Sequence, residues 1–112
     1  MSKRIIFLII PALFLLGGCQ KANDLVSDQP VTQTEAVAKC QQLCQQRLAD
    51  GINLSAGPCL SEKLLPDWVC DVAHNPRQVV DDNSNNQCQV YRQGAIGHFV
   101  EVDQNCKLIK AN

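Results

Sequence analysis

Five polar side chains in the second half of the chain could take part in binding or acid–base chemistry: Asp71, His74, Arg77, His98 and Glu101. A histidine can act as a general base when a carboxylate orients its ring. In regular strands, however, side chains alternate between faces, which separates Asp71 from His74 and His98 from Glu101. We therefore take these five as candidate binding residues and assign none of them a catalytic role.

The alternative for the 71–77 segment is purely structural. It comprises a surface His74 and an ion pair between Asp71 and Arg77 that braces the Asn75–Pro76 turn. The sequence holds no G-x-S-x-G nucleophile elbow that would favour a hydrolase.

Metal-binding patterns are weak in this sequence. Zinc sites use Cys and His at short paired spacings, but the chain has two histidines and no C-x-x-C. The loop from Asp81 begins like a calcium loop, yet Asn86 replaces its glycine and Arg92 its final glutamate. We expect no metal and no cofactor.

The N-terminus has the pattern of an export signal. Lys3 and Arg4 precede an apolar run from Ile5 to Leu16, which is shorter than the roughly 20 residues that span a bilayer. A basic start, a short apolar core and small residues at its end are typical of a secretory signal.

The residues Leu16-Gly17-Gly18-Cys19 resemble the lipobox of bacterial lipoproteins. The resemblance implies cleavage of a signal peptide, 1–18, before Cys19, and lipidation of its thiol as the membrane anchor. Gln20 stands where an aspartate commonly retains lipoproteins at the inner membrane, so an outer-membrane anchor facing the periplasm is favoured. The resemblance covers only the first nineteen residues and implies no activity for the rest. The alternative to a lipobox is an ordinary secretory signal with a cysteine nearby by chance.

The remaining 94 residues, 112 minus 18, allow a polar tether, 19–31 including Cys19, and one domain, 32–112. This part carries eight Lys and Arg (ten minus Lys3 and Arg4) against eleven Asp and Glu. Without a basic patch, it is not expected to bind nucleic acid. Its three aromatic residues predict a thin core that needs covalent support.

Six cysteines follow the tether, and an even number in a small exported domain predicts three disulfides. They are Cys40, Cys44, Cys59, Cys70, Cys88 and Cys106. The spacing leaves fifteen possible connectivities. We favour Cys44–Cys59 because the chain turns back after Gly51, Cys88–Cys106 across an expected hairpin, and Cys40–Cys70.

The sequence predicts an α+β domain with one N-terminal amphipathic helix and a small three- to four-stranded antiparallel sheet. A capping box at Thr32 and Glu35 begins the helix, and Gly51 ends it. Leucines at 60–65 suggest one helical turn. Strands are predicted at 68–73, 87–92 and 98–103, with a short segment at 106–109.

The stretches 68–77, 86–88 and 98–101 are similar to small uncharacterised prokaryotic exported proteins, a likeness that implies no activity. The leading hypothesis is a non-enzymatic cell-envelope lipoprotein. It would act as a disulfide-stabilised binding or structural module, for example an inhibitor, with an envelope protein or ligand as its partner. The alternative is a small periplasmic enzyme or metal-binding protein that uses the two histidines and nearby carboxylates.

Overall fold

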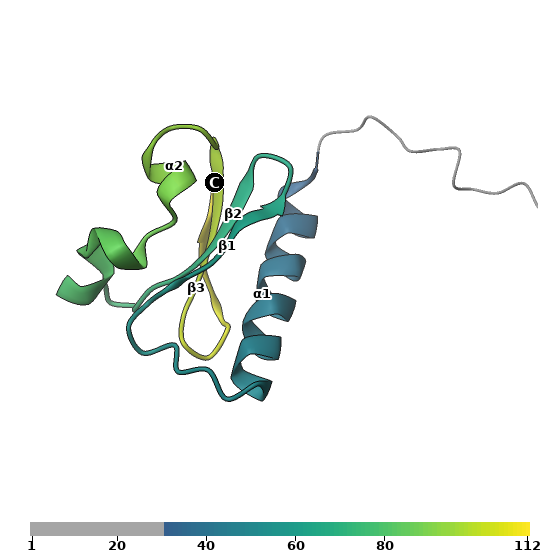
Figure 1. Ribbon diagram of the computed structural model, residues 1–112. Helices are drawn as coiled ribbons and strands as arrows, with labels where there is room; N and C mark the ends of the chain where they lie inside the picture. Colours follow the sequence, from purple (N-terminus) through teal and green to yellow (C-terminus); the bar gives the residue numbers. More distant parts are fainter. Residues whose placement is uncertain (1–30) are drawn as a thin grey trace, which may run out of the picture.

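The computed structural model describes residues 31–112 (Figure 1). The predicted signal peptide, Cys19 and residues 20–30 of the predicted tether lie outside this part of the chain. Among the helices of residues 31–112, none has the length and apolar character needed to cross a membrane.

The long helix α1 spans Gln33–Ala49 and begins with the predicted capping box. The Thr32 hydroxyl accepts a hydrogen bond from the Glu35 backbone N–H, and the Glu35 carboxylate accepts one from the Thr32 N–H. Two orphan donors of the first turn are thereby satisfied. The helix ends before Gly51, whose φ of +78° lies in the left-handed region that glycine adopts cheaply.

Four strands form one sheet in the order β1-β2-β3-β4. They are β1 (Cys59–Leu65), β2 (Trp68–Val72), β3 (His98–Val102) and β4 (Leu108–Ala111). The outer pairs are antiparallel, whereas β2 and β3 are parallel. The α+β class is confirmed, but the prediction of a purely antiparallel sheet was wrong for this central pair.

A parallel pair requires a crossover connection. Residues 73–97 form it and contain the short 3-10 helices η2 (Val79–Asp82) and η3 (Ser84–Asn86) and the helix α2 (Gln89–Arg92). The predicted strand at 87–92 is therefore wrong, because residues 89–92 form α2. The helical turn predicted at 60–65 is also wrong. Register shifts interrupt the pairing of β1, so its leucines do not follow a strict period of two.

The helix α1 covers one face of the sheet, and α2 with the short helices lies on the other side (Figure 1). The α1 face is apolar: Trp68, Cys70 and Val72 of β2 join Val100 and Val102 of β3 in the buried core. Alternation along the strands puts the intervening side chains of β2 and β3 on the opposite face. This second face carries the polar residues.

Three disulfides connect these layers: Cys40–Cys70, Cys44–Cys106 and Cys59–Cys88. The prediction of Cys40–Cys70 is confirmed, whereas Cys44–Cys59 and Cys88–Cys106 were wrong. The physical reason is the parallel crossover. It brings Cys88 back over β1, beside Cys59, and leaves the turn before β4 next to the last turns of α1.

Candidate functional site

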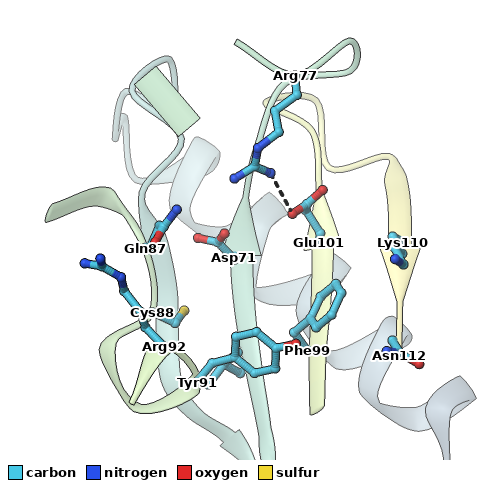
Figure 2. A pocket seen from close by; sticks show the side chains of 11 residues that line it. Asp71, Arg77, Gln87, Cys88, Tyr91, Arg92, Phe99, Glu101, Lys110 and Asn112 are labelled. Carbon is cyan, nitrogen blue, oxygen red and sulfur yellow. Dashed lines mark hydrogen bonds and ion pairs between the residues drawn. The ribbon is translucent and has the colours of Figure 1, made fainter. Parts of the chain in front are cut away.

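A pocket of about 420 Å³ opens on the sheet face opposite α1. Strands β2, β3 and β4 provide its floor, and the crossover provides its wall (Figure 2). Its volume lies within the range of roughly 300–1,000 Å³ that is usual for small-molecule sites. The lining residues are Val69, Asp71, Arg77, Gln87, Cys88, Tyr91, Arg92, Phe99, Glu101, Lys110 and Asn112.

Asp71 lies at the centre of this pocket. In Figure 2 its carboxyl group lies between Gln87 and Glu101, below the Arg77 guanidinium and above the aromatic rings. One of its oxygens, Oδ1, is buried and has no hydrogen-bond partner among the described residues. Such an oxygen is costly to leave unsatisfied, so a ligand donor that reached it would remove that cost.

The same environment keeps Asp71 uncharged. Burial raises the pKa of Asp71 to about 8, and the negative charge of Glu101 contributes in the same direction. Glu101 is the direct neighbour of Asp71 in the parallel register. At neutral pH most Asp71 side chains are therefore carboxylic acids, which both donate and accept hydrogen bonds.

Arg77 closes one side of the pocket but does not pair with Asp71. Its Nη1 lies 3.5 Å from Glu101 Oε2, and its Nε lies 2.8 Å from Asp82 Oδ1. Its Nη2 also donates to the backbone oxygen of Asp81 at 3.1 Å. The expected Asp71–Arg77 ion pair is replaced by these contacts, which anchor the guanidinium between the crossover and β3.

Tyr91 and Phe99 form an aromatic side of the pocket. Their ring centroids are 5.1 Å apart with an interplanar angle of 70°, an edge-to-face arrangement. Tyr91 is 40% exposed, so its ring is accessible from solvent. The Lys110 ammonium group lies 5.8 Å from the centroid of Phe99.

The position of Tyr91 is fixed through the first turn of α2. The Glu62 carboxylate of β1 accepts hydrogen bonds from the backbone N–H groups of Gln89 (2.7 Å) and Val90 (2.9 Å). The adjacent Cys59–Cys88 disulfide ties the same helix start to β1. Together these contacts hold the pocket wall against the sheet.

Cys59, Glu62 and Cys88 place three potential metal-ligand atoms within 4.8 Å of one another. The two sulfur atoms are bonded to each other, however, and the Glu62 oxygens already accept N–H groups. Thiolates are the form of cysteine that binds metals. This cluster is therefore a helix anchor in its oxidised form.

His74 lies away from the pocket, beyond the end of β2, and is buried rather than on the surface. Its Nδ1–H donates to Asp81 Oδ1 at 2.9 Å. Burial alone would raise the pKa of Asp81, but hydrogen bonds from the Gln78 N–H and from both the ring and backbone N–H of His74 outweigh it. They hold the pKa of Asp81 below its ordinary value.

His98 belongs to a third location. Its ring stacks on Trp68 with centroids 4.7 Å apart, and its Nε2 lies 3.5 Å from Asp67 Oδ2. Of the five candidates, the structure thus brings together Asp71, Arg77 and Glu101 in one pocket. His74 and His98 are separate from it, as strand alternation predicted for His98 and Glu101.

Sequence reasoning missed the aromatic residues of the pocket and the contribution of β4 to its lining. Phe99 lies two residues before Glu101 on β3, and Lys110 is the cross-strand partner of Glu101 on β4. Strand alternation could therefore have placed both side chains on the face of the pocket. Tyr91 and Gln87 come from the crossover, whose path depends on contacts that no local pattern reveals.

Comparisons with protein-family models, with curated proteins and with solved structures found no match for this chain. Its function is therefore inferred from the pocket itself.

Proposed function

We propose that this chain is a cell-envelope lipoprotein whose disulfide-linked domain is a non-enzymatic ligand-binding module. The observation that carries the proposal is the unpartnered, buried carboxyl oxygen of Asp71 inside a pocket with an aromatic side. Convergent polar groups in a partly apolar cavity are typical of small-molecule sites. Cys19 would anchor the module to the membrane, with the outer membrane favoured.

The covalent links support a binding role. The wall of the pocket is tied to β1 by Cys59–Cys88, and the floor is tied to α1 by Cys40–Cys70. A site held in its bound shape loses little conformational entropy when it captures a ligand. Three disulfides also suit an oxidising compartment such as the periplasm.

The anchor is tested by metabolic labelling of the full chain in a bacterial host with an alkyne-bearing fatty acid. We expect label in the wild type and none in Cys19→Ala, together with loss of the variant from the membrane fraction. Equal labelling of the two proteins, or no labelling of either, would contradict the lipoprotein assignment.

The binding role is tested by ligand-observed NMR on the oxidised full chain with neutral, cationic and anionic ring-shaped fragments. Fragments that occupy the pocket should lose their signal with Asp71→Leu and with Tyr91→Ala. The matched control is Asp50→Asn, because Asp50 is exposed at the end of α1 and far from the pocket lining. If no fragment responds to the pocket variants, the binding role is wrong.

One observation favours a second candidate, a small enzyme. Asp71 and Glu101 are neighbouring carboxyls, of which the first is held protonated and the second is paired with Arg77. A carboxyl held protonated beside a second carboxyl is found in acid–base pairs of enzymes. Turnover of a bound compound that is lost in both Asp71→Asn and Glu101→Gln would favour the enzyme over the binding module.

A further inference from the structure

Two of the three positive side chains of the pocket lining lie beside its one negative side chain, Glu101. Glu101 is contacted by Arg77 and lies opposite Lys110 in the antiparallel register. Arg92 adds a further positive charge to the lining. A cationic ligand would meet three positive side chains, and an anionic ligand would meet Glu101. An uncharged ligand avoids both costs.

Beside these charges, the pocket lining offers uncharged hydrogen-bonding groups. Asp71 offers an oxygen without a partner. Gln87 uses its amide nitrogen on the backbone oxygen of Asp81, at 3.1 Å, which leaves its amide oxygen to accept. Asn112 adds a second amide at the β4 side of the pocket. Such groups match a ligand with several hydroxyl or amide groups.

The aromatic side adds a requirement for shape. Tyr91 presents a partly exposed ring beside the polar groups, and Phe99 supports it edge to face. The electron-rich face of an aromatic ring attracts the weakly positive C–H groups of a second ring. A ligand that meets both sides therefore has one face of C–H groups and a rim of hydroxyls.

We propose that the pocket binds an uncharged sugar ring, stacked on Tyr91 and hydrogen-bonded through its hydroxyl or acetamido groups to Asp71 and Gln87. This inference rests on the proposed function, since it names the ligand class of the same pocket. A glycan displayed in the cell envelope is the corresponding partner.

The protonation state of Asp71 agrees with this ligand class. Burial and Glu101 raise its pKa to about 8, and Asp81 acts in the same direction, whereas Arg77 opposes them. Arg92 and Lys110 are the other charged groups of the lining. As a carboxylic acid, Asp71 donates one hydrogen bond to a hydroxyl and accepts another. Loss of its proton removes the donor.

The test is binding of N-acetylglucosamine and its β-1,4-linked tetramer to the oxidised full chain, measured by saturation-transfer NMR in a sugar-free detergent. We expect dissociation constants on the order of 1 mM or tighter. Affinity should be constant between pH 5.5 and 7 and fall about tenfold by pH 9.5, with a midpoint near the pKa of Asp71, about 8.

Two substitutions of Asp71 separate its role from folding. Asparagine keeps both a donor and an acceptor, so Asp71→Asn should bind within about threefold of the wild type at pH 7 and lose the pH dependence. Asp71→Leu should lose about tenfold or more. Tyr91→Ala should weaken binding without moving the pH midpoint, and Asp50→Asn should change neither.

Matched ring-shaped probes distinguish an uncharged sugar from charged ligands of similar shape. Cyclohexylammonium that binds more tightly above pH 8 and is lost in Asp71→Asn would overturn the sugar ligand and leave the binding module intact. So would pocket binding of cyclohexanecarboxylate alone. Failure of every probe, charged or neutral, would overturn both proposals. Cleavage of the tetramer would replace the binding module with the enzyme.

Discussion

Asp71 and Asp81 lie on either side of the Asn75–Pro76 turn, and both are withdrawn from solvent, yet they differ in charge. Asp81 accepts hydrogen bonds from the backbone N–H groups of His74 (3.0 Å) and Gln78 (2.9 Å) and from the His74 ring (2.9 Å). Its pKa is held below the ordinary value despite its burial. Asp71 has a single such donor, the backbone N–H of Val72, which does not offset burial, and its pKa is raised to about 8.

The difference shows that several hydrogen-bond donors can keep a withdrawn carboxyl ionised, whereas burial with a single donor does not. Asp81 uses both of its oxygens to join the end of β2 to η2, so nothing remains for a ligand. Asp71 keeps a free oxygen in a pocket. One aspartate is therefore structural, whereas the other has the features of a binding group.

The largest expected effect is from removing the Asp81 acceptor. Asp81→Ala leaves the donors of His74 and Gln78 without a partner and should destabilise the domain by about 3 kcal/mol. The lowered pKa of Asp81 stabilises the fold at pH values above 3.8, the pKa of the unfolded state. This stabilisation is lost as pH falls through the pKa of the folded state. The difference from wild type should thus shrink on acidification, as measured by denaturant unfolding without reductant.

The neighbouring Asp82→Ala is the matched control for this variant. Asp82 pairs with Arg77 at 2.8 Å, but its side chain is 67% exposed. Exposed pairs contribute between about 0 and 1 kcal/mol. If the two variants destabilise the domain equally, the structural role assigned to Asp81 is wrong.

Asp71→Asn should act in the opposite direction. The folded pKa of Asp71, about 8, exceeds the unfolded value of 3.8, so the folded state holds the proton more tightly. The contribution of Asp71 to stability is thus complete below about pH 4 and is lost as pH rises through 8. Asparagine does not ionise, so Asp71→Asn lacks this loss of stability with rising pH.

Between pH 5 and pH 9, the free energy of unfolding of Asp71→Asn should therefore rise relative to wild type. We expect a gain of about 2 kcal/mol, less than the full shift implies, because the side chain is only partly buried. Unfolding curves at the two pH values measure the gain. A difference that is independent of pH would show that Asp71 titrates normally.

A third change tests how closely the chain is packed around Asp81. Gly57 has φ of +67°, and a Cβ atom there would lie 2.6 Å from Asp81 Oδ1 and 3.0 Å from the backbone oxygen of Val72. Gly51 has a similar φ of +78° with open space around it. Gly57→Ala should therefore cost about 1 kcal/mol more than Gly51→Ala in unfolding experiments. Equal costs would mean that backbone conformation alone matters.

The helix and the central strands could be predicted from sequence because their signals are local. A capping box, a glycine stop and alternation at 68–73 each depend on residues close together in the chain. The predicted turn-back after Gly51 and the predicted hairpin led to two wrong disulfides. The parallel pairing of β2 and β3 depends on a crossover, and no local pattern reveals its path.

In the candidate site too, the strand residues could be predicted, whereas residues that depend on the crossover could not. Asp71 and Glu101 have the same parity in neighbouring strands, and Arg77 follows the turn, so three of the five candidates meet. The role of His74 could not be predicted, because its partner Asp81 comes from the crossover. Tyr91 was missed for the same reason: Glu62 of β1 holds α2 in place from a distant part of the chain.

The smallest expected effect distinguishes the two causes that act on Asp71. Glu101→Gln removes a negative charge from the neighbouring strand and should lower the pKa of Asp71. The pKa should stay above the ordinary value, because burial is the larger cause. Since the Arg77–Glu101 contact is long and Arg77 is half exposed, stability should change by less than about 0.5 kcal/mol.

Carbon-13 NMR of the side-chain carboxyls, followed against pH, measures this shift directly. Asp81 provides the internal control, because its hydrogen bonds come from His74 and Gln78 and do not involve Glu101. Its titration should be the same in wild type and Glu101→Gln. An unchanged Asp71 would mean that burial alone keeps it protonated. A shift of both aspartates would mean that the charge of Glu101 acts on both regions rather than on Asp71 alone.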